Sequence, residues 1–351
     1  MMDEILQEVM ALPKVRRWAE APGHRLSVGI AGASGTAVWP KAALGEEDGM
    51  APLYEIGSIT KTMTGLLLAI GEERGMWRRT DRLSELIPEW AASPFAARTN
   101  LLQLVTHTAG LDRMPANFSK TIQDRMNPYA SYSEDKLEEA VRSETLRKQG
   151  RHQYSNYGFG LLGWILSKRT GLNYPELLHE WVFAPLGMAH TSAKLQTQQT
   201  GRLLPVFSGK GRPVPHWEFQ DTMAGAGAVR STLPDMLGYI QAHLHAEGEG
   251  HPMEEPLKEC RKEHHLLFAG KGIGVGYAWM FYKEKDGSTT YWHNGGTYGS
   301  SSFAAFNPAK RIGFVILSNY GATLWSQLPL LGSRSMNADK LATIVSDKIL
   351  R

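Results

Sequence analysis

The position of strand-like segments at both ends of this 351-residue chain constrains its fold more than any other feature. LSVGIAG and TAVWP, near the N-terminus, are expected to form two short strands across a Gly/Ser turn. Strand signals return only after residue 260, as VGYAWMFY, TTYWHN, SSFAAF and IGFVILSN, and NPAKR is a hairpin-like connection between the last two. The sheet that opens near the N-terminus is therefore expected to resume near the C-terminus.

Helical patterns lie between and around these strands. Residues from about 76 to 260 lose strand character and carry helical stretches separated by Pro- and Gly-bearing loops: LQLVTH, SEDKLEEAVRS, YGFGLLGWILSKRTG and STLPDMLGYIQAHL. Three further helices are predicted at the N-terminus, at 58–75 and at 337–350, the last one capped by Asn337 or Asp339.

These patterns predict a two-lobed α+β fold with a mainly antiparallel sheet flanked by the terminal helices. Residues 1–75 and 261–351 are expected to form the sheet lobe, and residues 76–260 a mostly helical lobe inserted into it. A single core stops growing near roughly 250 to 300 residues, which also favours two lobes. The cleft between them is the expected position of a functional site.

Charge and composition exclude several classes of function. The net charge of +3 comes from 38 basic and 35 acidic residues that are scattered along the chain, so nucleic acid is not an expected partner. No run approaches the roughly 20 apolar residues that span a bilayer, and the first residues lack the pattern of a signal peptide. As written, the protein is expected in the cytoplasm, or outside it if a leader has been removed. A single cysteine, Cys260, excludes an internal disulfide.

The chemistry of the chain centres on Ser58 and Lys61, which stand three residues apart at the start of a predicted helix. Side chains at this spacing share one face, so the amine can reach the hydroxyl. A lysine acts as a base only when it is neutral, and burial can lower its pKa enough to make it so. The start of the helix also offers backbone N–H groups to an oxyanion.

The S-x-x-K pattern is weak by itself because it recurs at Ser133 and Lys136, where SEDKLEEA is typical of a capped, solvated helix start. Two other patterns occur once each: Y-x-N at Tyr154 and Asn156, and H-x-G at His293 and Gly295. A tyrosine near a lysine ammonium loses its proton more easily and can relay protons. Asn156 could orient a substrate amide or hold Lys61, and Gly295 and Gly296 would let substrate lie against the backbone. Each residue taken singly also has a structural explanation, as a cap, loop or strand-end residue.

The ordered set GSITK, YSN and HNGG resembles the three active-site motifs of the serine β-lactamase and penicillin-binding protein superfamily, in its Tyr-containing branch. That branch contains class C β-lactamases, D-Ala-D-Ala carboxypeptidases and related esterases. Further similar segments extend along the chain: LLQLVTHTAGL, PLGM with Thr191, GAGAVRST with Asp235, and SSFAAFNPAKRIGFVILSN.

The resemblance implies a serine hydrolase without metal or organic cofactor, which acts on a small molecule or short peptide. Ser58 would be acylated, Lys61 and Tyr154 would share the base and acid duties, and Asn156 would orient the substrate. The N–H groups of Ser58 and Gly296 would bind the oxyanion. The oligomeric state is not predicted.

Two departures from the family pattern bear on the substrate. β-Lactamases of this branch usually carry lysine at the position of His293, where it helps to hold the substrate carboxylate, and a histidine is mostly neutral at pH 7. Carboxypeptidase or esterase activity is therefore favoured over efficient β-lactam hydrolysis. The absence of a leader in the sequence as written favours an intracellular ester or amide. The alternative to an enzyme is a catalytically quiet member of the same fold that binds penicillin or a partner, or serves in assembly.

Other candidate signals are weaker. The twelve histidines match no tight metal-ligand spacing, and the glycines of AGKGIGVGYAW fail the dinucleotide-binding pattern. Four aromatic residues in irregular segments could line a pocket, although packing is the favoured role: Tyr129, Trp217, Phe219 and Tyr298.

Overall fold

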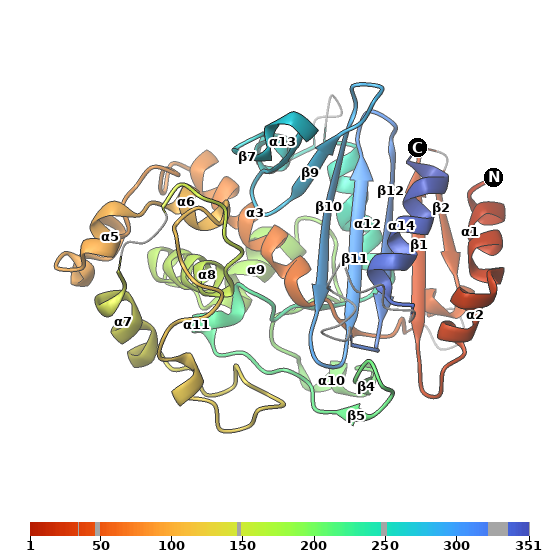
Figure 1. Ribbon diagram of the computed structural model, residues 1–351, viewed down its shortest axis with the longest axis horizontal. Coiled ribbons are helices and arrows are strands. Elements are labelled where there is room, and N and C mark those ends of the chain that lie inside the picture. The colour runs from red at the N-terminus through yellow and green to blue at the C-terminus, as the bar shows by residue number, and fades with distance from the viewer. Residues whose placement is uncertain (34, 46–49, 146–148, 247–250, 322–335, 351) are drawn as a thin grey trace.

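An eight-stranded antiparallel sheet forms the centre of the protein (Figure 1). The computed structural model describes residues 1–33, 35–45, 50–145, 149–246, 251–321 and 336–350. The sheet order is β2-β1-β12-β11-β10-β9-β8-β7. The strands are β1 (Leu26–Gly32), β2 (Gly35–Trp39), β7 (His265–Phe268), β8 (Ile273–Val275), β9 (Met280–Lys283), β10 (Thr289–Gly296), β11 (Ser301–Asn307) and β12 (Ile312–Ser318).

The pairing of β1 with β12 joins the two ends of the chain in one sheet, with Val28 opposite Ile316. The expectation that the sheet resumes near the C-terminus is therefore confirmed, as is the α+β fold with a mainly antiparallel sheet. The NPAKR connection joins β11 and β12 as an antiparallel pair.

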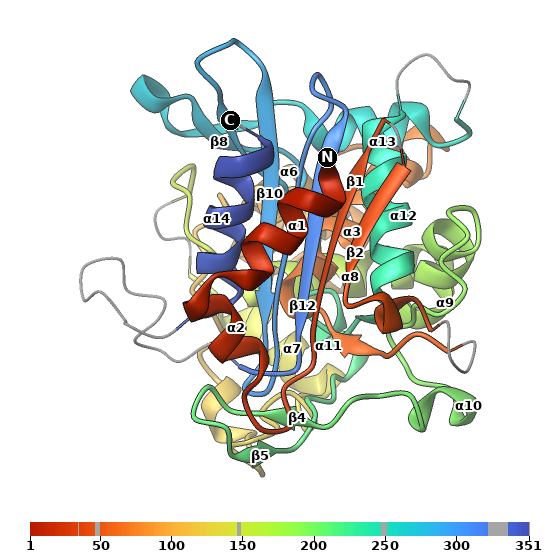
Figure 2. The same ribbon diagram turned by 90° about the vertical axis from the view of Figure 1, so that its right-hand side faces the viewer.

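Three helices cover the outer face of the sheet: α1 (Met2–Ala11), α2 (Pro13–Ala19) and α14 (Ala338–Ile349) (Figure 2). In β12, Phe314 and Ile316 point to this layer, while Val315 and Leu317 belong to the core on the other face. This alternation is the period of two that a strand covered on both faces uses. The predicted cap of α14 is Asn337, whose side chain accepts a hydrogen bond from the N–H of Lys340.

The inner face packs on α12 (Leu233–Leu244), which contacts β1, β11 and β12. A Cβ on Gly29 of β1 would lie 2.7 Å from Cδ1 of Leu237, so the absence of a side chain there lets this helix approach. Next to it, α3 (Thr60–Glu73) contacts α13 (Glu254–Arg261) and α8 (Asn156–Thr170), and is buried along nearly its whole length. The rigid central position of α3 is what holds the residues at its start.

The remaining elements are short. The helices are α4 (Leu83–Leu86), α5 (Pro94–Arg98), α6 (Leu101–Val105), α7 (Glu134–Ser143), α9 (Tyr174–Leu178), α10 (Thr197–Thr200), α11 (Asp221–Ala224), a π-helix η5 (His179–Phe183) and the 3-10 turns η1 (Lys41–Leu44), η2 (Gly57–Ile59), η3 (Pro88–Trp90), η4 (Phe118–Lys120) and η6 (Ala269–Lys271). The two-residue strands pair as β3 (Tyr54–Glu55) with β6 (Arg230–Ser231) and β4 (Val206–Phe207) with β5 (Pro213–Val214).

None of the helices in the described ranges is long and apolar enough to cross a membrane. The assignment of residues 1–75 and 261–351 to one lobe and 76–260 to another stays a prediction.

One predicted strand is wrong. VGYAWMFY was expected to form one extended segment, but the chain turns back within it, so that β8 and β9 pair with each other. Gly276 N–H bonds to the carbonyl of Trp279, and Ala278 takes a left-handed φ of 64°. A Cβ on Gly276 would lie 2.3 Å from the carbonyl oxygen of Cys260, so a larger residue would be excluded from this tight turn. Apolar periodicity does not reveal a turn of this kind because its residues, Tyr277 and Trp279 among them, are buried like those of a strand.

Candidate active site

Ser58 lies in the 3-10 turn η2, which leads directly into α3. Gly57 precedes it with a left-handed φ of 50°, a conformation that glycine adopts without strain. The side chain of Ser58 is half-buried and makes no capping bond in this turn, so the helix-cap explanation does not apply. Its Oγ lies 3.1 Å from Nζ of Lys61, one helical turn later.

Lys61 is completely buried and has no carboxylate partner among the residues that the structure describes. Its Nζ donates to Oδ1 of Asn156 at 2.9 Å and to the carbonyl oxygen of Ala226 at 2.7 Å. Burial, with a smaller contribution from the Arg113 guanidinium, holds the pKa of Lys61 well below 10.5. The amine is therefore biased towards the neutral form that a base requires.

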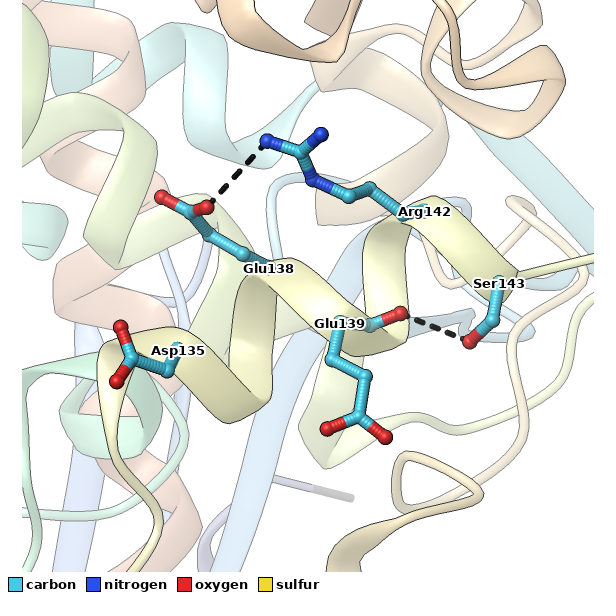
Figure 3. A pocket seen from close by; sticks show the side chains of 5 residues that line it. All are labelled: Asp135, Glu138, Glu139, Arg142 and Ser143. Atoms are coloured by element: carbon cyan, nitrogen blue, oxygen red, sulfur yellow. Dashed lines mark hydrogen bonds and ion pairs between the residues drawn. The ribbon is translucent and has the colours of Figure 1, made fainter.

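The second S-x-x-K pattern has the opposite character. Ser133 is the N-cap residue of α7, although its side chain makes no capping hydrogen bond there. Lys136 forms an exposed ion pair with Glu139 at 2.7 Å, and its pKa is raised by this pair. Figure 3 shows a hollow on the same helix, lined by Asp135, Glu138, Glu139, Arg142 and Ser143. Its groups are bound to one another along the helix: Arg142 pairs with Glu138, and the Ser143 hydroxyl donates to the carbonyl oxygen of Glu139. The same sequence pattern therefore gives a solvated lysine here and a buried one at Lys61.

Tyr154 lies just before α8, with its ring centroid 4.9 Å from Nζ of Lys61. Burial raises the pKa of Tyr154 to about 12, against a smaller lowering from its hydrogen bond to Ser58. The sequence argument expected a nearby ammonium to ease loss of the phenolic proton. The direction is reversed because desolvation penalises the phenolate more than its neighbours stabilise it. Near pH 7 Tyr154 is a proton donor in the resting site.

Asn156 is the first residue of α8, and its side chain is buried between two partners. Its Oδ1 accepts from Lys61, and its Nδ2 donates to the hydroxyl of Tyr129 at 2.9 Å. Of the two tasks considered for it, the structure directly shows that it holds Lys61.

His293 lies near the end of β10 and is 97% removed from solvent, with 3% of its surface exposed. Its Nδ1 lies 2.6 Å from the carbonyl oxygen of Asn294, which can only accept, so Nδ1 carries the proton. Burial lowers the pKa of His293 to about 3, and the Lys61 amine acts in the same direction. His293 is therefore neutral at pH 7, and its Nε2 is left as an acceptor.

The glycines after His293 pack against the turn that carries Ser58. A Cβ on Gly295 would lie 2.0 Å from the carbonyl oxygen of Ile56 and 3.0 Å from the backbone N of Ser58. A Cβ on Gly57 would lie 2.4 Å from the backbone N of Gly296. The absence of side chains at these positions brings the end of β10 against the nucleophile turn, and the N–H groups of Ser58 and Gly296 into one region.

Three residues that the sequence did not single out belong to this region. Glu55 is buried and accepts hydrogen bonds from Thr297 Oγ1 at 2.6 Å and from the N–H of Trp217 at 2.9 Å, which ties both segments to the strand before Ser58. The ring of His107 contacts that of Tyr154 in a tilted arrangement, with 4.6 Å between ring centroids. Arg113 lies 5.5 Å from the centroid of the same ring. An acid in the apolar run LYEIGS was the one available signal for Glu55.

The four aromatic residues set aside as packing form one cluster. Tyr129 stacks on Phe219 at 4.5 Å and contacts Trp217 at 5.1 Å, and Trp217 meets Tyr298 edge-on at 4.9 Å. Tyr129 is buried, whereas Tyr298 is 45% exposed. The cluster reaches the site through the bond between Tyr129 and Asn156. It therefore connects the packed interior with the surface beside the site.

Across the described ranges, no group of three or more His, Cys, Asp or Glu is arranged to hold an ion. His243, one of the twelve histidines, is enclosed by aromatic rings.

Comparison with known proteins gives one consistent family. A family model described as beta-lactamase matches residues 42–328. The beta-lactamase of Pseudomonas fluorescens is 24% identical over 298 residues, covering 76% of this chain and 79% of the relative. The D-alanyl-D-alanine-carboxypeptidase/endopeptidase AmpH of Escherichia coli K12 is 27% identical over 298 residues, covering 79% and 73%.

Solved structures agree on the fold. The D-alanine carboxypeptidase AmpC from Burkholderia cenocepacia superposes with a TM-score of 0.77 at 21% identity, covering 99% of each chain. A class C beta lactamase from Rhodobacter sphaeroides gives 0.77 at 19% identity, covering 99% of this chain and 100% of that one.

Proposed function

The chain belongs to the beta-lactamase family and is a serine hydrolase, and we propose that Ser58 is the residue it acylates, with Lys61 as base and Tyr154 as acid. One observation carries this assignment: a buried lysine whose two N–H bonds are engaged beside a serine hydroxyl. Asn156 Oδ1 and the carbonyl of Ala226 can only accept, so a neutral Lys61 donates one proton to each. Its lone pair is then free to accept the proton of Ser58 Oγ.

The proton path follows from these states. Ser58 attacks the carbonyl carbon as its proton passes to Lys61, and the N–H groups of Ser58 and Gly296 stabilise the oxyanion. Tyr154, protonated at rest, donates to the leaving group and recovers its proton from the Lys61 ammonium. Water then attacks the acyl carbonyl as its proton passes to Lys61. The bond between Ser58 Oγ and the acyl carbon breaks as Oγ takes a proton from Tyr154, which recovers it from the Lys61 ammonium. Loss of one oxyanion donor costs about 10²–10³ in kcat in a known serine hydrolase.

The proposed substrate is an ester, or the amide of a small molecule or short peptide, rather than a nucleic acid. The family relatives include proteins named beta-lactamase and D-alanyl-D-alanine-carboxypeptidase/endopeptidase. His293 argues against an efficient β-lactamase, because a neutral imidazole with a free acceptor cannot supply the cation that a substrate carboxylate requires at this position. Carboxypeptidase or esterase chemistry is the proposed preference.

The test is covalent labelling at Ser58. Intact-mass spectrometry after incubation with penicillins, a fluorophosphonate and activated esters is expected to show an adduct that Ser58→Ala abolishes. Turnover of p-nitrophenyl esters is expected to be lost in Lys61→Ala and in Tyr154→Phe. Ser133→Ala is the matched control, because it alters the solvated copy of the same pattern. Absence of any Ser58-dependent adduct would leave the catalytically quiet alternative instead.

A further inference from the structure

We propose that Arg113 is a specificity-determining residue that binds an acidic group of the substrate. The inference rests on the proposed function and names the substrate class for the same site: esters or amides that carry a carboxylate. The motif residues around Ser58 carry no permanent positive charge that could hold such a carboxylate.

The two basic side chains of the three motifs do not supply a permanent cation. His293 is neutral at pH 7, with its Nδ1 proton given to a backbone carbonyl. Burial disfavours the ammonium form of Lys61, whose N–H groups are already engaged. Arginine, in contrast, stays charged at any physiological pH.

Arg113 is exposed, and its guanidinium carbon lies 5.5 Å from the ring centroid of Tyr154. Within the parts of the chain that the structure describes, no carboxylate lies within ion-pair distance of it; its neighbour Asp112 instead accepts from Nε2 of Gln153 at 2.8 Å. Other arginines of the chain are paired, such as Arg16 with Glu20 and Arg142 with Glu138. A charged fork of five N–H donors therefore faces solvent beside the proposed proton donor.

The backbone fixes where this cation sits. The carbonyl oxygen of Arg113 accepts from the N–H groups of Asn156 at 2.9 Å and Tyr157 at 3.1 Å, at the start of α8. Arg113 is thereby anchored to the same turn that carries the Y-x-N motif. These bonds fix the backbone of Arg113 beside Tyr154, and its guanidinium carbon lies 5.5 Å from the centroid of that ring.

The field of Arg113 also reaches the centre of the site. It contributes to the lowered pKa of Lys61 and acts on Tyr154 and Tyr129. The partial positive charge at the N-terminus of α8 has the same sign. An anionic group that approaches Tyr154 is therefore attracted, and a guanidinium can bind a carboxylate through two parallel hydrogen bonds.

The experiment compares matched esters with Arg113→Gln. The neutral ester is p-nitrophenyl pentanoate. The acidic esters are mono-p-nitrophenyl glutarate, with the carboxylate on the acyl side, and 3-acetoxybenzoate, with the carboxylate on the leaving side. Measurements are made at a pH where kcat/KM for the neutral ester no longer changes with pH. Arg113→Lys keeps the charge but loses the fork, and Arg17→Gln removes an exposed arginine on α2, on the outer face of the sheet.

We expect Arg113→Gln to lower kcat/KM by about 10- to 100-fold for at least one acidic ester, chiefly through KM, as expected for loss of a charge-assisted hydrogen bond. The loss for the neutral ester should be much smaller, the Arg17→Gln control should leave all three esters unchanged, and Arg113→Lys should retain part of the preference. The acidic ester that responds tells which side of the scissile bond Arg113 faces. The preference should also shrink with added salt, because the guanidinium is exposed.

Equal effects of Arg113→Gln on the neutral and acidic esters would overturn the inference while leaving the proposed function intact. A protein that turns over none of the esters and forms no adduct at Ser58 would refute the proposed function, and the inference with it.

Discussion

Gly295→Ala is the smallest change that should disable the site while leaving the proposed catalytic side chains in place. The added Cβ would lie 2.0 Å from the carbonyl oxygen of Ile56, 2.5 Å from Oγ of Ser302 and 3.0 Å from the backbone N of Ser58. Non-bonded carbon contacts are optimal at roughly 3.5–4.0 Å. The obstructing atom at 2.0 Å belongs to the backbone, so a rotamer change cannot relieve it.

The end of β10 must therefore move away from the nucleophile turn by about 1 Å or more. A misplacement of that size can lower the rate by about 10²-fold. The N–H of Gly296 moves with the strand, so the oxyanion loses alignment with one of its two proposed donors. Overpacking of this kind costs about 1–3 kcal/mol in stability, which leaves a well-packed protein folded.

The assay measures kcat/KM for p-nitrophenyl pentanoate together with thermal unfolding. We expect a loss of about 10²-fold in kcat/KM for Gly295→Ala, with a melting temperature lowered by a few degrees. Gly296→Ala is the neighbouring comparison, because its Cβ would meet only the carbonyl oxygen of Ser300, at 3.2 Å, and a smaller loss is expected. Wild-type activity in Gly295→Ala would refute the argument that close packing of β10 on the turn aligns the site.

Three further predictions concern protonation and buried polar groups. For a neutral ester, kcat/KM should fall as the pH drops through the lowered pKa of Lys61, since protonation removes the base; Arg113→Gln raises that pKa and should move the acid limb to higher pH. Tyr129→Phe leaves Nδ2 of Asn156 without its oxygen acceptor, so that only the contact with Sδ of Met114 at 3.9 Å remains. It should lower kcat/KM by about 5- to 150-fold, an effect of about 1–3 kcal/mol, whereas unchanged kinetics would contradict a role for that bond. His243→Leu should raise the melting temperature more at pH 5.5 than at pH 8, with activity at pH 8 unchanged.

The sign of the His243 effect follows from proton linkage. His243 is fully buried among Tyr239, Trp279 and Phe306, both of its ring nitrogens lack a hydrogen-bond partner in the described ranges, and burial holds its pKa well below 6.5. The unfolded chain binds a proton at this residue below about pH 6.5 and the folded chain does not, so stability is lost as the pH falls. Leucine removes both this loss and the cost of the unpaired nitrogens. A melting temperature that rises equally at both pH values would contradict the linkage.

The sequence predicted the sheet and the motif residues that surround Ser58, because both depend on local sequence patterns. The strand signals SSFAAF and IGFVILSN and the turn residues of NPAKR correctly predicted the β11–β12 hairpin. The strand expected at VGYAWMFY failed because the tight turn at Gly276 packs on the backbone of Cys260 in α13, and a pattern of apolar residues does not show that contact. The difference between Lys61 and Lys136 was likewise foreseen from their neighbours, but its physical cause, complete burial against an exposed ion pair, is visible only in three dimensions.

Protonation states were the property that the sequence predicted least well. His293 was expected to be mostly neutral from its ordinary pKa, whereas the structure adds two causes: burial, and a carbonyl that takes the Nδ1 proton. Tyr154 was expected to lose its proton readily, and desolvation reverses that direction. The pKa values of both side chains depend on burial, because residues far away in the chain exclude solvent from them. A motif identifies which groups meet, while their charge depends on how deeply the fold buries them.

The three motifs do not determine the substrate of this site. The family position that usually carries a cation holds a neutral acceptor in this chain, and a permanent charge beside Tyr154 comes from Arg113, outside all three motifs. In this chain the cation lies on an exposed residue beside α8 instead of at the buried end of β10. An acidic group is therefore held from a different direction. The exposed position also weakens that hold, because water and salt screen an exposed charge more than a buried one. A site of this kind favours an acidic substrate that binds modestly and leaves readily, and in which the carboxylate sits over Tyr154 rather than against β10.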